Sequence, residues 1–432
     1  MRVRRRPPGA GVTAPLSRTA FHQLARVGAA PSALAVLRSA LHARRLLLLK
    51  AFLVRVHRHR DTVEPDARAG FERSWDLLEQ VERRHPAVVR DVLDYPTTGA
   101  WLAAALTAPA GPGLDRLLGH LESLAATAAL RAGGSLDLTV GTPDGLLSLP
   151  GLGRLRVAAP RVRISADDRS IRFHPDGARR ALPVVLALVD RQRGVLAGHG
   201  PGWSEVRSLP GGAVRLDDVD PYRVPEGAQV VVAADRADTD HGAWSACWRA
   251  AQTLLGRTDP GRAAEVAEDV RAVVPVVPRG PRHLGATLSA APGAVLTSLP
   301  EQGEGMAQTL VHELHHSKLA TIHDIVPLYG PGREAVHRVG WRPDPRPVDG
   351  VLHGAYAHLA LADLWRRAAT ADGVRRAWRS EVGHQFGDIH DQVGQALGIL
   401  LESDELTAEG REFTRQMRLH HASLGATTFA GG

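Results

Sequence analysis

The feature that most constrains the fold of this 432-residue chain is its hydrophobic pattern, which changes twice along the sequence. From about residue 15 to 130, apolar residues recur at intervals of three and four, the period of an amphipathic helix. Between residues 133 and 240, short β-type runs alternate with Gly, Pro and Asp, which is typical of strands joined by turns. Helical patterning returns after Asp240, interrupted by strand-like runs at 272–278 and 294–298. The sequence therefore predicts an α+β fold.

The same changes of pattern predict the domain organisation. The basic run from Arg2 to Arg6 is followed by two prolines, which favours a disordered leader. We expect four segments: a disordered basic leader at 1–15, a helical region at 16–132, a β-rich region at 133–240, and a mainly helical metal-binding region at 241–425.

The net charge of +7 raises the question of a nucleic-acid partner. Only Lys50 and Lys318 are lysines, and all other basic residues are arginine. Abundant Arg, Ala, Gly and Pro are expected of a GC-rich genome, so codon bias explains part of the basicity. Aromatic residues make up only 4% of the chain, whereas nucleic-acid binders interleave aromatics with a concentrated basic face. We therefore expect no nucleic-acid partner.

The sequence also predicts a cytoplasmic protein without a membrane span. The longest apolar run, from Leu46 to Val54, is interrupted by Lys50 and is far shorter than the roughly 20 residues that a bilayer requires. No apolar core of signal-peptide type follows the basic N-terminus. The single cysteine, Cys247, excludes an internal disulfide and a Cys-based zinc site, and its apolar neighbours predict a buried structural thiol.

The strongest chemical signal is the pattern His-Glu-x-x-His, which runs from His312 to His316. Two histidines four residues apart on a helix lie on one face, one turn apart, so their imidazoles can bind the same metal ion. The intervening Glu313 can act as a base on metal-bound water. The alternative interpretation is an exposed helix rich in histidine.

Two histidines leave a metal site incomplete, so a third ligand is needed. The metzincin extension would require Gly at 319 and His at 322, but the chain has Leu319 and Ile322. Glu334 could serve as a ligand from a loop rich in Gly and Pro. The better candidates are His353 and His358, at the start of a second apolar helix that could pack antiparallel against the first.

Several dispersed segments together resemble one known family. They are the helix around Phe21–Gly28 and the leucine-rich helix near Leu46, with Leu149–Arg154, Leu310–Leu319, Asp324–Leu328, Pro343–Pro347, His353–Ala357 and Leu406–Gly410. Over about residues 18–420, the chain is similar to the HExxH-containing peptide-modification domains of actinobacterial ribosomal-peptide gene clusters. Some of those domains are fused behind radical-SAM maturases of FXSXX-type peptides.

The resemblance implies an iron(II)- and 2-oxoglutarate-dependent hydroxylase that oxidises a β-carbon in a ribosomally made precursor peptide. His312 and His316 match the family's motif histidines, and His353 matches its later histidine before Gly-Ala-Tyr. His358 is a departure, since the family often has an apolar residue there. In this scheme the three histidines hold iron, 2-oxoglutarate chelates it, and Glu313 orients a ligand or water.

Three histidines suit zinc as well as iron, so two other functions stay open. A zinc metallopeptidase that trims the same kind of peptide would use Glu313 as its base. A non-catalytic leader-peptide binding protein would add a peptide strand to a sheet edge in the 133–235 region. The oxygenase additionally needs a cation for the distal carboxylate of 2-oxoglutarate, for which Lys318, Arg342 and Arg346 are candidates near the motif. No particular oligomeric state is expected.

Overall fold

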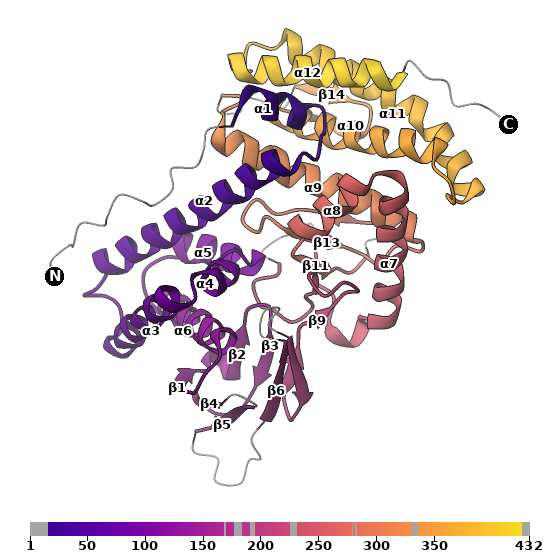
Figure 1. Cartoon of the computed structure of the whole chain (residues 1–432). Coiled ribbons are helices and arrows are strands. Elements are labelled where there is room, and N and C mark those ends of the chain that lie inside the picture. The colour runs from indigo at the N-terminus through magenta and orange to yellow at the C-terminus, as the bar shows by residue number, and fades with distance from the viewer. Residues whose placement is uncertain are drawn as a thin grey trace. The chain divides into compact units, whose positions relative to one another are not determined.

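The computed structural model describes residues 16–167, 170–176, 184–190, 195–224, 231–278, 280, 283–330 and 336–425. Figure 1 shows helices toward both ends of this chain and β-sheets in its middle. The α+β class predicted from the sequence is therefore confirmed. The basic leader predicted for residues 1–15 lies outside the described residues.

Helices account for most of the described structure. They are α1 Arg18–Ala25, α2 Pro31–Arg58, α3 Pro65–Arg84, α4 Pro86–Leu93, α5 Pro96–Thr107, α6 Pro112–Ala132, α7 His241–Thr258, α8 Pro260–Asp269, α9 Gly303–Ile325, α10 Val348–Thr370, α11 Arg376–Glu402 and α12 Ala408–Gly425.

The strands are short and lie between α6 and α10. They are β1 Leu136–Gly141, β2 Leu146–Leu149, β3 Gly153–Arg156, β4 Arg161–Ala166, β5 Ile171–Pro175, β6 Val184–Asp190, β7 Val195–His199, β8 Trp203–Glu205, β9 Arg207–Ser208, β10 Arg215–Leu216, β11 Ala272–Pro275, β12 Gly285–Ala286, β13 Ala294–Thr297, β14 His337–Val339 and β15 Arg342–Arg346.

The chain divides into two compact units, each assembled from separate stretches of sequence. Unit 1 comprises the described residues up to 44, residues 257–265, and those from 318 onward. Unit 2 comprises 45–256 and 266–317. Helices α1–α6 lie within the stretch predicted to be helical, and β1–β10 lie within the stretch predicted to be β-rich. The boundaries of those segments as separate domains stay predictions.

Proline residues mark where four helices of unit 2 begin. A proline suits the first helical position because its fixed φ is already helical and its missing N–H has no partner to lose there. Trp101 on α5 and Phe52 on α2 are fully buried in the core beside these helices, with ring centroids 5.1 Å apart in an edge-on arrangement. The prolines at these helix starts are Pro65, Pro86, Pro96 and Pro112.

One five-stranded sheet of unit 2 positions the HExxH helix. Its strand order is β12-β13-β11-β10-β9, with parallel pairing from β13 to β10 and an antiparallel strand at each edge. All residues of β11 and β13 are buried, as expected for parallel strands covered on both faces. The chain leaves β13 at Thr297 and enters α9 at Gly303, so the sheet fixes where the motif helix begins. Two further sheets of unit 2 have the orders β1-β4-β5-β6-β7 and β2-β3-β8.

Unit 1 is built from helices α1, α10, α11 and α12, with the C-terminal part of α9 and the β14–β15 hairpin. Tyr356 on α10 is fully buried, and its hydroxyl donates a 2.7 Å hydrogen bond to the carbonyl of Leu24 on α1. Phe413 on α12 packs edge-on against Phe21, with ring centroids 5.4 Å apart. The Tyr356 hydrogen bond ties α10, which carries His353 and His358, to α1.

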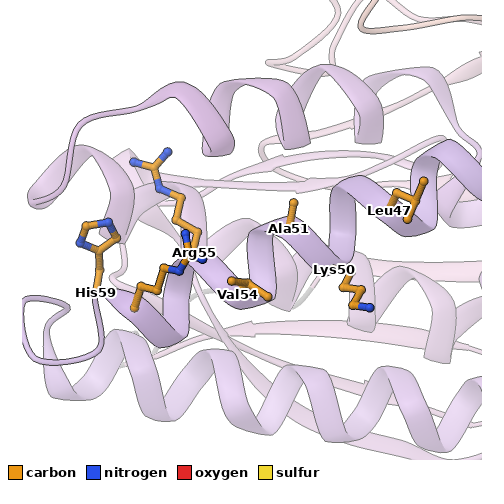
Figure 2. Close-up of a pocket in the computed structure, with 7 residues that line it drawn as sticks. Leu47, Lys50, Ala51, Val54, Arg55 and His59 are labelled. Carbon is orange, nitrogen blue, oxygen red and sulfur yellow. The ribbon is translucent and has the colours of Figure 1, made fainter. Parts of the chain in front are cut away.

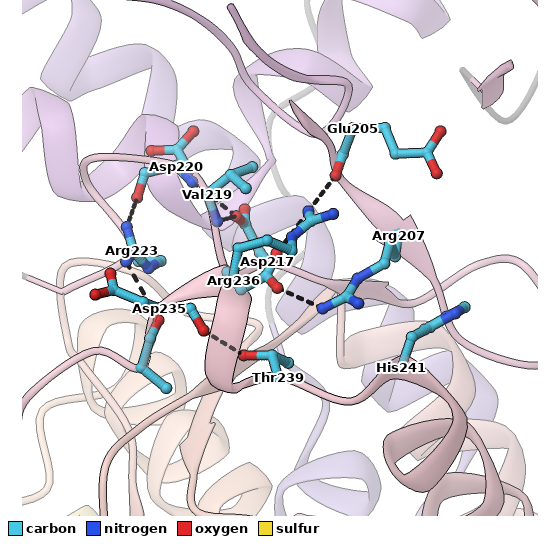
Figure 3. Close-up of polar contacts among 12 residues, drawn as sticks. Glu205, Arg207, Asp217, Val219, Asp220, Arg223, Asp235, Arg236, Thr239 and His241 are labelled. Carbon is cyan, nitrogen blue, oxygen red and sulfur yellow. Dashed lines mark hydrogen bonds and ion pairs between the residues drawn. The ribbon is translucent and has the colours of Figure 1, made fainter. Parts of the chain in front are cut away.

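Three buried acids form a polar network after β10 in unit 2, part of which Figure 3 shows. Asp217 accepts a 2.7 Å hydrogen bond from the Tyr95 hydroxyl, and its other oxygen accepts from backbone N–H groups. Asp220 accepts from the Thr97 hydroxyl at 3.0 Å. Asp218 pairs with two arginines, one of which is Arg236 at 2.7 Å. Because buried polar groups are costly without partners, this network ties the loop after β10 to the start of α5.

The Asp217–Asp220 pair predicts a pH dependence of stability. Burial raises the pKa of Asp217, and burial together with the charge of Asp217 raises the pKa of Asp220 to about 7. Because Asp220 binds its proton more tightly in the folded than in the unfolded protein, protonation contributes to the free energy of unfolding. This contribution is complete below the unfolded pKa of 3.8 and is lost as the pH rises through the folded pKa of about 7.

We therefore compare wild type with Asp220→Asn by urea unfolding between pH 5 and 8. Replacing Asp220 removes its titration, so the wild-type advantage should shrink with rising pH, by up to about 1.4 kcal/mol per pH unit below pH 7. A difference that stays constant over this range would contradict the prediction.

Candidate metal centre

The motif histidines lie together on α9, within unit 2. The Nε2 atoms of His312 and His316 are 3.1 Å apart, and their rings are nearly perpendicular, with centroids 4.8 Å apart. Two imidazole nitrogens at about 2.0–2.1 Å from a tetrahedral zinc ion stand about 3.3 Å from each other. Both side chains are half-buried. The pair therefore has the spacing of two ligands to one ion and can be reached from solvent.

Glu313 lies on the adjacent, buried side of the same helix. It is 6% exposed, and burial raises the pKa of its carboxyl to about 8. The carboxyl faces β12, because a Cβ on Gly285 would stand only 3.0 Å from Glu313 Oε1. A buried carboxyl with a pKa near neutrality can hold or accept a proton, which is the property that acid–base work requires.

Hydroxyl and imidazole contacts hold the β12 segment against α9. His283 Nε2 lies 2.8 Å from the Thr309 hydroxyl, and His283 Nδ1 lies 3.1 Å from the Ser298 hydroxyl. Further along, the hydroxyls of Thr287 and Ser317 are 2.8 Å apart. Sequence reasoning missed this strand and its anchors, since no periodic pattern marks a segment this short.

His353 and His358 both lie on α10, within unit 1. His353 Nε2 is 3.4 Å from the Tyr329 hydroxyl, and burial lowers the pKa of His353 to about 4. Its imidazole is therefore neutral, the form that binds metals. His358 Nδ1 lies 2.8 Å from the carbonyl oxygen of Gly354, and its ring stacks on Trp341 with centroids 4.6 Å apart.

The structure brings two of the predicted ligands together. Among the residues that it describes, no group of three or more His, Cys, Asp or Glu side chains is arranged to hold a metal ion. His312 and His316 fit one ion as a pair, and His353 stays a prediction as the third ligand. Glu334, the loop candidate, lies outside the described residues.

The candidate cations for 2-oxoglutarate differ in exposure. Lys318 is buried in unit 1, where its Nζ pairs with Glu265 and donates to the carbonyl of Gly28 at 3.3 Å. Arg342 and Arg346 lie on the β14–β15 hairpin, where both pair with Asp344. Because Lys318 already neutralises a buried carboxylate, the two arginines are the better candidates.

Two other sequence features can now be placed. Cys247 is buried with Sγ 3.6 Å from the carbonyl of Gln302, and burial raises the pKa of its thiol to about 11, as suits a structural residue. The apolar run near Leu46 forms part of a groove of about 690 Å³ at α2, whose lining combines apolar and basic side chains (Figure 2). The lining residues are Leu47, Lys50, Ala51, Val54, Arg55, Arg58 and His59.

None of the helices in the described ranges combines the length and apolarity needed to cross a bilayer.

Comparison with known proteins does not assign the chain to a family. No protein-family model matches the chain, and no curated protein matches it at a significant level. The resemblance to the HExxH peptide-modification domains therefore rests on the sequence segments alone.

Proposed function

We propose that this chain is an iron(II)- and 2-oxoglutarate-dependent hydroxylase that acts on a β-carbon of a ribosomally made precursor peptide. The observation that carries the metal part of this proposal is the 3.1 Å separation of the Nε2 atoms of His312 and His316. The substrate class, a precursor peptide, and the cosubstrate, 2-oxoglutarate, are inferred from the sequence resemblance.

The roles of the residues follow from their surroundings. His312 and His316 would bind iron, with His353 as the third ligand, and the low pKa that burial gives His353 keeps its nitrogen available. Iron held there would activate dioxygen, so that one oxygen atom enters the substrate as C–OH and the other enters succinate as 2-oxoglutarate loses carbon dioxide. Glu313 would orient a ligand or water through its buried carboxyl.

One observation favours a second candidate, a zinc metallopeptidase. Glu313 stands directly after His312, and its buried carboxyl occupies the position that the base of a His-Glu-x-x-His hydrolase takes. In that case His312 and His316 hold zinc, and Glu313 is the base in peptide-bond hydrolysis.

The two enzymes require different reagents. We expect a precursor peptide substrate to gain one oxygen atom without cleavage, only when iron(II), dioxygen and 2-oxoglutarate are all present. Succinate should form in step with product, because 2-oxoglutarate supplies two electrons per turnover. Mass spectrometry of the peptide and an assay of succinate measure both. A peptidase needs only water and would cleave the peptide with zinc under nitrogen.

Glu313→Gln distinguishes the two roles of the carboxyl. As an orienting residue, its loss should cost about 10- to 100-fold in rate, whereas loss of a hydrolytic base should cost several orders of magnitude. Glu304→Gln, the same change in the first turn of α9, serves as the control. Cleavage under nitrogen that disappears in Glu313→Gln would overturn the hydroxylase proposal in favour of the peptidase.

A further inference from the structure

Four arginines of unit 2 gather near a single buried carboxylate, that of Asp218. The Asp218 side chain is 0% exposed; its Oδ1 pairs with Arg236 at 2.7 Å, and its Oδ2 pairs with Arg207 (Figure 3). Both oxygens of this carboxylate are therefore taken by two of the four guanidinium groups. We call the four residues the arginine cluster: Arg154, Arg207, Arg223 and Arg236.

Strand β3 places Arg154 next to the acidic loop after β10. It is the central strand of the sheet β2-β3-β8, where Arg154 stands opposite Ser148 on one side and Ser204 on the other. Side chains directly opposite each other in an antiparallel pair project from the same face. The Ser148 hydroxyl donates to Asp220 Oδ2 at 3.5 Å, so this face of the sheet is turned toward the loop that carries Asp218.

Backbone carbonyls hold two other members of the cluster beside the same loop and sheet. Arg223 donates a 2.7 Å hydrogen bond to the carbonyl of Asp220. Arg236 donates to the carbonyl of Glu205 on β8, the residue that follows Ser204. These guanidinium groups are already held in place, so a ligand that binds there does not have to order them first, and the entropic cost of binding is lower.

Arg154 is surrounded by charges of its own sign. Burial lowers the pKa of its guanidinium, and the charges of Arg223, Arg156 and Arg236 lower it further, while Asp218 acts in the opposite direction. Within the described ranges, the Arg154 guanidinium forms no hydrogen bond or ion pair. Because nearby like charges disfavour the charged form of a group, an anion beside Arg154 would relieve this repulsion.

The cluster also has more hydrogen-bond donors than its surroundings use. The Nε atoms of Arg207, Arg223 and Arg236 are buried and have no hydrogen-bond partner in the part of the chain that the structure describes. The other two acids of the loop, Asp217 and Asp220, accept instead from hydroxyls at the start of α5 and from backbone N–H groups. The protein therefore supplies fewer acceptors than these arginines can engage.

We propose that the arginine cluster binds a phosphate group, either inorganic phosphate or the phosphate of a small organic molecule. A planar guanidinium donates paired hydrogen bonds to phosphate oxygens. A phosphate group carries a charge of about −1.5 to −2 at pH 7 and several acceptor oxygens, so it matches a group of cations better than one carboxylate does. The side chains of Arg207 and Arg236 are 14% and 29% exposed, so a ligand can reach them from solvent.

This inference goes beyond the proposed function and does not depend on it, because none of the motif residues on α9 takes part. It also differs from the search for a cation that binds 2-oxoglutarate, which concerned Lys318, Arg342 and Arg346. The expected ligand is a small phosphate compound, in agreement with the expectation that the chain has no nucleic-acid partner.

Isothermal titration calorimetry of the full wild-type chain tests the ligand class. The ligands are inorganic phosphate, glycerol 3-phosphate and succinate, at one ionic strength set with sodium chloride. Succinate carries two negative charges on carboxylates, so it separates phosphate recognition from attraction to any dianion. At least one phosphate compound should bind about tenfold or more tightly than succinate. Tighter binding of glycerol 3-phosphate would identify an organic phosphate as the ligand, and tighter binding of inorganic phosphate would identify the free ion. Equal binding of succinate, or no binding of either phosphate compound, would overturn the proposal.

Substitution of Arg154 tests the location of the site. Arg154→Met removes the guanidinium and keeps most of the apolar stem, so the phosphate compound should bind at least about tenfold more weakly. Arg249→Met is the matched control, because it makes the same change at an exposed position of α7. Its binding should stay within about twofold of wild type. Equal affinities of the two variants would place the ligand elsewhere and refute the site.

A second variant keeps the test decisive if Arg154→Met does not fold. Arg156 is exposed on the same strand, and its charge acts on Arg154. Arg156→Met should therefore leave the fold intact, as judged by circular dichroism, and weaken phosphate binding about fivefold through the loss of one nearby positive charge. Phosphate affinity in Arg156→Met that equals the affinity in Arg249→Met would contradict the assignment.

Discussion

His312→Ala and His316→Ala should each abolish measurable binding of iron(II) or zinc by the full chain. The two Nε2 atoms are 3.1 Å apart, a spacing that suits two ligands of one ion, so either change leaves one motif ligand. Changes to residues that merely orient a ligand typically cost 10- to 100-fold in affinity, and loss of a ligand itself should cost more than about 100-fold. Equilibrium dialysis followed by elemental analysis measures the loss.

The fold should survive both substitutions. The imidazoles are half-buried, and the helix that carries them is held by buried neighbours such as Leu310 and Leu319, each 0% exposed. A chain of this length has a large core without a metal, so the thermal midpoint of the metal-free variants should match that of the metal-free wild type. Circular dichroism provides this control.

The same measurement of metal binding by equilibrium dialysis distinguishes the candidates for the third ligand. His353→Ala should weaken metal binding strongly, whereas His358→Ala should leave it within about threefold, because the His358 ring is engaged on Trp341 and with the Gly354 carbonyl. His384→Ala, on an exposed face of α11, is the matched surface control. Full metal occupancy in both His312→Ala and His316→Ala would refute the metal centre, and loss only in His358→Ala would move the third ligand to that residue.

Local sequence was sufficient to predict the helices and the motif pair. The geometry of His312 and His316 depends only on their spacing along one helix, and the α+β class depends on periodicities that are visible within a dozen residues. The α10 helix that carries His353 was predicted for the same reason, from its apolar period after Pro347.

Contacts between distant segments could not be predicted in this way. Nothing near Asp217 in the sequence indicates that Tyr95, more than a hundred residues earlier, will donate to it. The placement of Gly285 over Glu313 likewise depends on the sheet that brings β12 to α9. Lys318 was considered for 2-oxoglutarate because it stands near the motif in sequence, whereas its position in the fold is decided by Glu265 on α8.

Replacement of Glu265 should strongly destabilise unit 1. Its carboxylate is fully buried and pairs with both Lys318 and Arg262, whose side chains are 2% and 4% exposed. Glu265→Ala would leave two buried cations without their common anion. Removing one partner of a buried ion pair typically costs about 3–5 kcal/mol, mostly from the charge left behind. We therefore expect the free energy of unfolding of metal-free protein, measured in urea, to fall by about that amount.

A second substitution tests whether the unpaired charge causes this loss. Lys318→Met removes one of the stranded cations and keeps most of the apolar volume, so Glu265→Ala combined with Lys318→Met should regain part of the lost stability. Arg262 would still be held by the carbonyl of Val27, to which its guanidinium donates. Glu268→Ala, an exposed position on the same helix, should change the free energy of unfolding by less than about 0.5 kcal/mol. If Glu265→Ala costs no more than Glu268→Ala, water reaches these charges and Lys318 becomes available again as a partner for a carboxylate ligand.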